Sequence, residues 1–330
     1  MSVLVCGGAG YIGSHCVKML CDLGEDVVVI DNLSTGYLKA IDKRATVYLG
    51  DIQDELLLNT IFKQHMIFEV IHFAAFSLVG ESMKEPLKYY DNNVVGTIQL
   101  LKSMVKHNVK KIVFSSTAAV YGDHELMPIT ENFDTIPSNT YGETKLAMED
   151  MMKWADVAYG IKFMALRYFN VAGAHHSSLI GEAHHPETHL IPIVLQVPLG
   201  QRSHITIFGD DYATFDGTCI RDYIHVEDLI EGHILALKSL RSGAQSNIYN
   251  LGSGSGYSVL EVIEAARRVT KHPIPVKVEA RRAGDPARLI ASSEKIETEL
   301  GWVRRYNSID DIIQSAWNFH QSHPNGYNTR

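Results

Sequence analysis

Short apolar runs alternate with longer amphipathic segments through the first half of the chain. The runs are predicted strands at residues 3–6, 27–30, 45–49, 70–73, 111–114 and 163–167. Most of the segments between them carry apolar residues at helical spacing and are predicted helices at residues 12–23, 56–64, 86–107 and 141–159. Continuous apolar strands that alternate with helices indicate a parallel sheet with helices on both faces. The pattern therefore predicts a Rossmann-type, doubly wound α/β fold.

The second half of the chain is less regular. Helical patterns occur near residues 190–199, 225–240, 258–270 and 308–321, and strand-like pieces near 205–208, 247–251 and 276–279. Glycine and histidine residues cluster between 173 and 189. We therefore predict two domains, a cofactor-binding Rossmann domain at 1–172 and a smaller mixed α/β substrate domain at 173–330, with elements that can interleave.

Composition narrows the class of protein without deciding its function. Of 330 residues, 45% are hydrophobic and 21% charged, as in ordinary globular proteins. A net charge of −8 makes the chain a poor general binder of nucleic acid. No apolar run approaches the roughly 18 residues that cross a membrane, no secretory signal opens the chain, and the four cysteines lack metal or disulfide spacing. We expect a cytoplasmic protein with reduced thiols and with neither nucleic-acid nor membrane partners.

The N-terminal segment VLVCGGAGYIGSH predicts a dinucleotide-binding loop. Gly7, Gly10 and Gly13 follow a predicted strand and open a predicted helix, where bare backbone can approach a pyrophosphate. Their spacing is a variant of the usual fingerprint. Asp31 ends the second predicted strand, close to the separation of about 20 residues at which an acid binds the adenosine ribose. A carboxylate there favours NAD over NADP, and the alternative is a structural glycine turn in another doubly wound sheet.

Two further groups of polar residues suggest chemistry on an alcohol. Ser115, Ser116 and Thr117 follow the fifth predicted strand, at the sheet edge where ligands bind. Of the 15 tyrosines, only Tyr141 has a lysine four residues later, Lys145, which places both on one helical face. Removal of a hydride from a carbinol needs a base, and a nearby ammonium and a positive nicotinamide ring both favour phenolate. Alone, these groups could be a polar strand end and a surface pair; with the glycine loop, they indicate an oxidoreductase site.

These motifs together resemble the extended short-chain dehydrogenase/reductase superfamily, and within it the UDP-glucose 4-epimerase family. The narrower resemblance extends over nearly the whole chain and rests on the segments YYDNNVVGT (89–97), LRYFNVAGAH (166–175), DGTCIRDYIHVEDL (216–229), YNLGSGSGYSV (249–259) and RRAGDPARL (281–289).

The resemblance implies roles for individual residues. Tyr141 would be the catalytic base, Lys145 its partner, and Thr117 the hydroxyl beside it. The residues implied to bind NAD are Gly7, Gly10, Tyr11, Ile12, Gly13, Asp31, Asn32, Asp51, Ile52, Phe73, Asn92, Ser115, Tyr141, Lys145 and Tyr168. The residues implied to bind the UDP-sugar are Thr117, Phe169, Asn170, His189, Leu190, Arg221, Arg282, Asp285 and Leu289. Guanidinium groups suit a diphosphate because they bind its oxygens in pairs.

The chain departs from the family pattern at three positions. Ser77 stands where many epimerases carry a lysine near the cofactor phosphates, and His189 where many carry an asparagine near the substrate diphosphate. Leu289 stands where a tyrosine in some members, or a smaller residue in others, borders the sugar's 2-position. Leucine is intermediate in size, so acceptance of UDP-N-acetylglucosamine and UDP-N-acetylgalactosamine stays open.

The segment GAHHSSLIGEAHHPETH at 173–189 contains five histidines. Zinc needs ligands in a fixed geometry, and these histidines have no familiar ligand spacing. The sequence therefore favours a surface or substrate loop over a metal site, and we expect no metal.

The resemblance implies reversible C4 epimerisation of UDP-glucose and UDP-galactose, a step of galactose metabolism, in a homodimer formed by helices 86–107 and 141–159. A 4,6-dehydratase is disfavoured because Ala118 and Ala119 follow Thr117, where those enzymes carry an acidic pair. The alternatives are an epimerase acting mainly on UDP-N-acetylglucosamine, another NAD-dependent nucleotide-sugar oxidoreductase with net NADH formation, and a nucleotide-sensing protein without catalysis.

Overall fold

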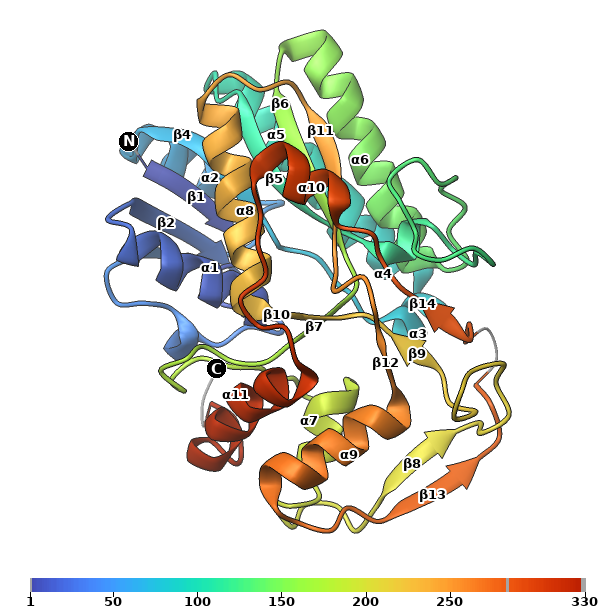
Figure 1. The fold of residues 1–330 in the computed structure, drawn as a ribbon. Coiled ribbons are helices and arrows are strands. Elements are labelled where there is room, and N and C mark those ends of the chain that lie inside the picture. The colour runs from blue at the N-terminus through green and yellow to red at the C-terminus, as the bar shows by residue number, and fades with distance from the viewer. Residues whose placement is uncertain (1, 283–284, 328–330) are drawn as a thin grey trace.

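A seven-stranded parallel sheet organises the larger part of the molecule (Figure 1). The computed structural model describes residues 2–282 and 285–327. The strand order is β11-β6-β5-β4-β1-β2-β3. The strands are β1 (Ser2–Cys6), β2 (Asp26–Asp31), β3 (Thr46–Leu49), β4 (Ile67–His72), β5 (Lys111–Thr117), β6 (Lys162–Tyr168) and β11 (Asn247–Leu251). This order reverses direction between β1 and β4, and a sheet of this kind binds its ligands at that point, beyond the carboxyl ends of its strands.

Helices cover both faces of the sheet, as the alternating sequence pattern predicted. Apolar residues of α1 (Tyr11–Asp22), α8 (Val226–Arg241) and α10 (Glu294–Leu300) pack on one face. Those of α2 (Glu55–Gln64), α5 (Gly96–Lys106) and α6 (Thr140–Tyr159) pack on the other. β11 and α8 come from the second half of the chain, so the halves of the sequence interleave in space.

A smaller lobe lies at the carboxyl end of the sheet, at the bottom of Figure 1. Its elements are β7 (Asn170–Ala172), α7 (Leu190–Leu195), β8 (Ile205–Phe208), β9 (Ile220–Arg221), β10 (Tyr223–His225), β12 (Tyr257–Ser258), α9 (Val259–Thr270), β13 (Val276–Glu279), β14 (Arg288–Leu289) and α11 (Ile309–Ser322). Apolar residues of α7, α9 and α11 form its core. Ser258 and Glu261 cap the start of α9 reciprocally, which fixes where that helix begins. None of the helices among the described residues is long and apolar enough to cross a membrane.

The predicted helix at 86–107 is interrupted. The structure has α4 (Pro86–Tyr89), a π-helical segment at Tyr90–Val95 and then α5. Buried Asn93 accounts for the interruption: its side chain donates to Thr144 Oγ1 at 3.0 Å and to the Phe76 carbonyl at 3.1 Å, and accepts from the Phe76 amide at 2.8 Å. π-Helical segments of this kind are often found at functional sites, and this one carries Asn92 into the cavity described below.

The other differences from the predicted elements concern short segments. The helix predicted at 190–199 ends at Leu195, because Pro198 disfavours helical backbone at the residue before it. The sequence did not predict two short helices, α3 (Val79–Ser82) and α10, or the 3₁₀ turns at Leu38–Ala40 and Ala118–Val120. It also did not predict the short strands β7, β9, β10, β12 and β14. These elements have too few residues to show a period in sequence.

We expect the free energy of unfolding to fall as the pH falls, because four histidines are buried. Burial lowers the pKa of His15 and His233 to about 4, and that of His72 and His225 to about 3. The unfolded chain therefore binds more protons than the folded one below pH 6.5. Each group is expected to remove up to about 1.4 kcal/mol of unfolding free energy per pH unit as the pH falls from about 6.5 to 4.

Urea unfolding at a series of pH values measures this effect. A His233→Gln variant should show a shallower fall of the unfolding free energy with acidification, because one buried group no longer titrates. His272→Gln, at an exposed position, should leave the pH dependence unchanged. A wild-type unfolding free energy that stays constant between pH 6.5 and 5 would contradict the expectation.

Candidate active site

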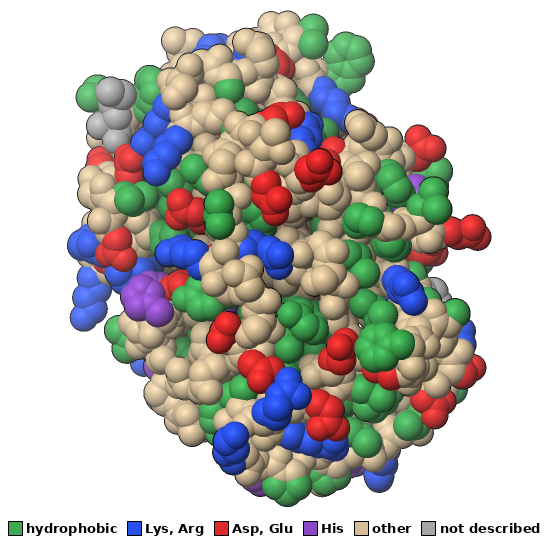
Figure 2. Space-filling view, viewed as in Figure 1, with side chains coloured by type: hydrophobic (Ala, Val, Ile, Leu, Met, Phe, Trp, Pro, Cys, Tyr) green, Lys and Arg blue, Asp and Glu red, His purple; other side chains and the backbone are tan. Residues whose placement is uncertain are grey.

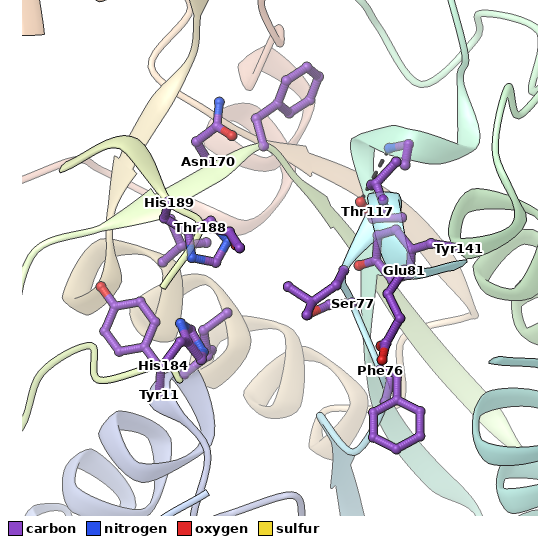
Figure 3. A pocket seen from close by; sticks show the side chains of 18 of the residues that line it. Tyr11, Phe76, Ser77, Glu81, Thr117, Tyr141, Asn170, His184, Thr188 and His189 are labelled. Atoms are coloured by element: carbon purple, nitrogen blue, oxygen red, sulfur yellow. Dashed lines mark hydrogen bonds between the residues drawn. The ribbon is translucent and has the colours of Figure 1, made fainter. Parts of the chain in front are cut away.

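One cavity of about 1080 Å³ opens at the carboxyl edge of the sheet and continues into the smaller lobe. Every residue that the family resemblance assigned to the cofactor, the substrate or the chemistry lines this cavity. Ser116, between Ser115 and Thr117, does not line it: its side chain is buried and donates to Glu149. Figure 3 shows Tyr141, Thr117, Ser77 and Glu81 on one side. Ala283 and Gly284 of the RRAGDPARL segment lie outside the described residues. The structure therefore brings together residues that are far apart in the sequence, from Gly7 to Leu289.

The glycine loop after β1 has the geometry of a phosphate cradle. Gly7 has φ +81°, and a Cβ there would lie 2.6 Å from the Ala74 amide nitrogen. A Cβ on Gly13 would lie 2.0 Å from the Gly7 carbonyl oxygen. Gly10 caps α1 without a side chain, so the first amides of that helix face the cavity unobstructed. Backbone amides at the N-terminus of a twelve-residue helix favour an anion, and this cradle fits the pyrophosphate of a dinucleotide.

Asp31 ends β2 and is tied to the same loop. Its carboxylate accepts hydrogen bonds from the amides of Ala9 and Leu33, each at 2.8 Å. Burial raises the pKa of Asp31, although these two hydrogen bonds oppose the shift. Nearby, the Asn32 side chain donates to Asp51 at 2.8 Å. The carboxylate therefore faces the cavity in a fixed orientation, as the binding of two ribose hydroxyls requires.

The reactive wall joins β5 to α6. Asn139 caps α6 by accepting from the Gly142 amide at 2.9 Å, and the helix then places Tyr141 and Lys145 one turn apart beside Thr117. Tyr141 hydrogen-bonds to Thr117. Lys145 Nζ donates to the Ser115 carbonyl at 2.8 Å and lies 6.0 Å from the centroid of the Tyr141 ring. The structure thus brings the phenol, the ammonium and the Thr117 hydroxyl together on one wall of the cavity.

Burial dominates the electrostatics of this wall. Burial raises the pKa of Tyr141 to about 12, and the hydrogen bond from Thr117 offsets only part of this shift. Burial likewise lowers the pKa of Lys145 to about 7. The groups of the chain therefore favour the phenol form of Tyr141, because burial disfavours the charged form. A lowered Tyr141 pKa would need the positive charge of an oxidised nicotinamide ring next to it.

The far end of the cavity carries the predicted guanidinium groups. Arg221, at the end of β9, donates to Asp285 at 2.7 Å and to the Pro286 carbonyl at 2.8 Å. The guanidinium of Arg282 lies 3.9 Å above the centroid of the Phe208 ring. Asn170 donates to the Asp222 carbonyl at 3.2 Å, which fixes its side chain at the cavity wall. Two cations and an amide in one region suit a diphosphate.

Comparison with known proteins identifies the family. The model of the NAD dependent epimerase/dehydratase family matches residues 3–252. The chain belongs to this family. A UDP-glucose 4-epimerase of Halalkalibacterium halodurans is 59% identical over 329 residues, which cover 100% of this chain and 98% of that protein.

Solved structures of UDP-glucose 4-epimerases superpose closely on this chain. A crystal structure of a UDP-glucose 4-epimerase matches with a TM-score of 0.99 and 57% identity, covering 100% of both chains. The UDP-glucose 4-epimerase from Bifidobacterium longum, in complex with NAD+ and UDP, matches with a TM-score of 0.93 and 42% identity. That match covers 99% of this chain and 100% of the other.

Several cavity residues were not singled out from the sequence. They include Glu81, Glu182, His184, Glu187 and Phe208. The histidines of the 173–189 segment were candidates only as possible metal ligands, and the two glutamates between them were not candidates. The alternation of acidic and imidazole side chains in EAHHPETH was the available signal for Glu182 and Glu187.

Asp31 is predicted to select the cofactor. An Asp31→Asn variant keeps the side-chain shape but loses the charge, so it should bind NAD more weakly by about 10-fold or more, since hydrogen bonds to a charged group contribute about 1.5–3 kcal/mol. The preference for NAD over NADP should fall as well, because the 2′-phosphate no longer meets a carboxylate. Thermal stabilisation by each cofactor measures both effects. Asp42→Asn, in a surface loop outside the cavity lining, is the control, and equal NAD affinity in both variants would contradict the assignment.

Proposed function

We propose that the protein inverts C4 of UDP-glucose and UDP-galactose reversibly, using tightly held NAD. The observation that carries this proposal is the continuity of one cavity from the glycine loop and Asp31, past Tyr141, to Arg221 and Arg282. Such a cavity can hold a dinucleotide and a nucleotide sugar end to end, with the sugar between the nicotinamide ring and Tyr141. Family membership and the UDP-glucose 4-epimerases of high identity support the same conclusion.

The roles of the residues follow from their positions. NAD, when bound, accepts the C4 hydride and returns it to the opposite face of the 4-keto sugar. Tyr141 takes the C4 hydroxyl proton, through or alongside Thr117, and later gives it back. Lys145 is close enough to the reactive wall to hold the nicotinamide ribose.

The site must hold the nucleotide of the substrate firmly and leave the sugar free to turn. Arg221, Arg282 and Asn170 hold the diphosphate, so the nucleotide stays in place while the sugar turns over about its link to it. A site complementary to only one epimer would trap that epimer. Ala118 and Ala119, which follow Thr117, add no charge at the sugar, and the acidic pair that a dehydratase needs is absent from these two positions.

Leu289 bears on which sugars are accepted. It lines the cavity and packs in a small apolar cluster with Val120, Tyr121 and Phe169. A branched side chain packed in this way leaves less room than a small residue and more than an aromatic ring. The second candidate activity, on UDP-N-acetylglucosamine, depends on this room.

The test uses purified protein with no added nucleotide cofactor. UDP-galactose and, separately, UDP-N-acetylgalactosamine are incubated with the protein, and the products are resolved by chromatography. Formation of UDP-glucose is the expected result, and formation of UDP-N-acetylglucosamine as well would show that Leu289 leaves the pocket open. No turnover of either substrate, even with NAD supplied, would contradict the proposed function.

We also infer a cytoplasmic homodimer assembled through α4–α5 and α6. These helices pack against each other, and they expose large apolar side chains: Leu87, Tyr90, Val95, Ile98, Trp154 and Val157. A second copy covering this face would bury them. Sedimentation of the wild type against a Trp154→Glu/Val157→Glu variant measures the assembly.

On the face shown in Figure 2, acidic and basic side chains are interspersed without a continuous basic patch, which supports the expectation of no nucleic-acid partner.

A further inference from the structure

The segment from Glu182 to His189 places two carboxylates and two imidazoles on the cavity wall. Figure 3 shows the two imidazoles, those of His184 and His189. His189 Nδ1 and His184 Nδ1 lie 2.6 and 3.1 Å from the same atom, Glu182 Oε1. Glu187 completes the group, with one oxygen 3.4 Å from His189 Nδ1 and the other 3.9 Å from His184 Nδ1. Each residue offers one ligand atom, and all four atoms lie within 4.8 Å of one another.

These separations suit a small divalent ion. In a tetrahedral zinc site with bonds of about 2.0–2.1 Å, the ligand atoms lie about 3.3–3.4 Å apart. The separations of 2.6, 3.1 and 3.4 Å among Glu182 Oε1, the two Nδ1 atoms and Glu187 Oε1 are close to or below that value, and the second Glu187 oxygen lies 3.9 Å from His184 Nδ1. Small side-chain rotations would therefore be enough to place all four atoms at bonding distance from one ion.

We propose that Glu182, His184, Glu187 and His189 form a binding site for a divalent transition-metal ion such as Zn²⁺ or Co²⁺. Imidazole and carboxylate ligands suit these ions, and two carboxylates neutralise the charge of one ion. The site goes beyond the proposed epimerisation, which needs no metal. The spacing of the histidines alone predicts no metal site in this loop. The structure places two glutamates beside them as further possible ligands.

The group is built into the fold, and one side of it faces the cavity. The Glu182 side chain is only 4% exposed, whereas that of His189 is 48% exposed. The His184 ring packs edge-on to the ring of Tyr11, which in turn donates to the Gly173 carbonyl at 2.7 Å. An ion here would therefore have fixed ligands on its buried side, and the partly exposed His189 would let it enter from the cavity.

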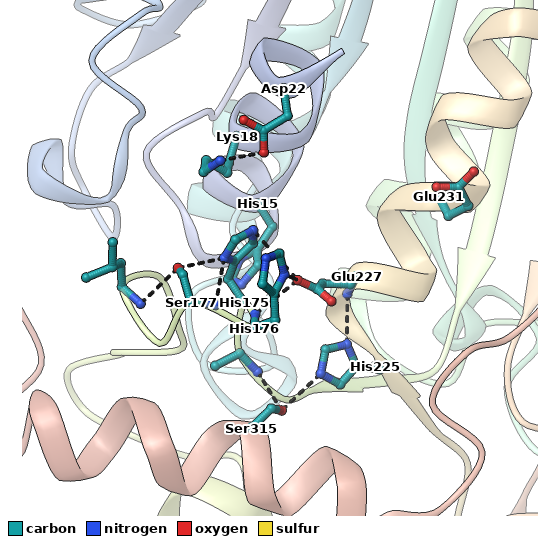
Figure 4. A network of polar contacts seen from close by, with 12 residues as sticks. His15, Lys18, Asp22, His175, His176, Ser177, His225, Glu227, Glu231 and Ser315 are labelled. Atoms are coloured by element: carbon teal, nitrogen blue, oxygen red, sulfur yellow. Dashed lines mark hydrogen bonds and ion pairs between the residues drawn. The ribbon is translucent and has the colours of Figure 1, made fainter.

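A second group in the described residues offers fewer ligands and serves as a control. His175, His176 and Glu227 come together beside His15 in the network of Figure 4, outside the cavity lining. Glu227 lies 2.8 Å from His176 Nδ1 and accepts from Tyr306 at 2.5 Å. His176 is also 71% exposed. The group lacks the fourth ligand of the cavity site.

The experiment titrates the full-length protein, freed of metal by a chelator, with Co²⁺. Visible absorption reports the coordination geometry and calorimetry the affinity. We expect one equivalent of tetrahedrally coordinated Co²⁺. His184→Gln and His189→Gln should each weaken metal binding at least about 100-fold. Loss of a residue that only hydrogen-bonds to a metal ligand already lowers metal affinity by about 10–100-fold. His176→Gln should bind as the wild type does.

Circular dichroism and NAD-induced thermal stabilisation establish that each variant is folded. Glu187→Gln provides an independent ligand variant if one histidine variant does not fold. Absence of a Co²⁺ spectrum in the wild type would overturn the proposal. Binding that survives both histidine variants, or that is lost only in His176→Gln, would place the ion elsewhere and overturn it equally. None of these readouts depends on turnover.

Discussion

Replacement of Tyr141 by phenylalanine is expected to lower kcat by about 10²- to 10⁴-fold, the usual contribution of a positioned acid–base group. The change removes one oxygen from a buried ring that hydrogen-bonds to Thr117 and lies one helical turn from Lys145. Substrate and NAD should still bind, because the groups assigned to the pyrophosphate, the ribose and the diphosphate are unchanged. Initial rates with UDP-galactose, together with the NAD content of the purified variant, measure both parts of this prediction.

Tyr159→Phe is the matched control. Tyr159 is the last residue of the same helix and is 54% exposed, so this variant should have wild-type activity. Wild-type activity in Tyr141→Phe would remove the proposed base and favour the non-catalytic, nucleotide-sensing alternative. A large fall in both variants would point to a disturbance of α6 rather than to the loss of a proton-transfer group.

Replacement of Glu149 by glutamine is expected to lower the free energy of unfolding by about 3–5 kcal/mol, the usual cost of breaking a buried ion pair. Glu149 and Arg167 form two hydrogen bonds, of 2.9 and 2.6 Å, and their side chains are 0% and 4% exposed. Ser116 donates to the same carboxylate at 2.5 Å. The pair therefore ties α6, which carries Tyr141, to β5 and β6, and its loss leaves the Arg167 charge buried without a partner. Urea unfolding measures the change.

The neighbouring residue on α6 provides the control. Asp150 pairs with Lys153 at 2.9 Å, but the two side chains are 55% and 47% exposed. Asp150→Asn should therefore cost less than about 1 kcal/mol. The double variant Glu149→Leu/Arg167→Met should be more stable than Glu149→Gln, because no unpaired charge remains. Equal costs for Glu149→Gln and Asp150→Asn would contradict the structural role of the buried pair.

The sequence predicted best where local signals determine the structure. The glycine loop, the strand ending at Asp31 and the helix carrying Tyr141 and Lys145 each follow from short-range patterns: a backbone turn, an apolar run and a helical period. Parallel strands then bring their carboxyl ends to one edge by geometry alone. The placement of the candidate residues around one cavity therefore followed from the order of the elements and from the family resemblance.

What the sequence could not show depends on contacts between distant residues. The π-helical turn at Tyr90–Val95 exists because Asn93 reaches Thr144 and Phe76, and no period in the segment itself signals it. Strand β11 could be expected, but its pairing with β6 could not, because partner choice is set by the packed sheet. The raised pKa of Tyr141 likewise results from burial, which is a property of the folded molecule.

The central claim is that the C4 hydride leaves and returns to the same sugar within one cavity. A mixture of UDP-galactose carrying deuterium at C4 and UDP-galactose carrying carbon-13 elsewhere in the sugar tests this claim directly. After conversion without added cofactor, mass spectrometry of the UDP-glucose should find deuterium retained, and only in molecules that lack carbon-13. Loss of deuterium to water would indicate proton abstraction at C4, and deuterium in the carbon-13 molecules would indicate exchange of the reduced cofactor between turnovers. Either result would contradict the account.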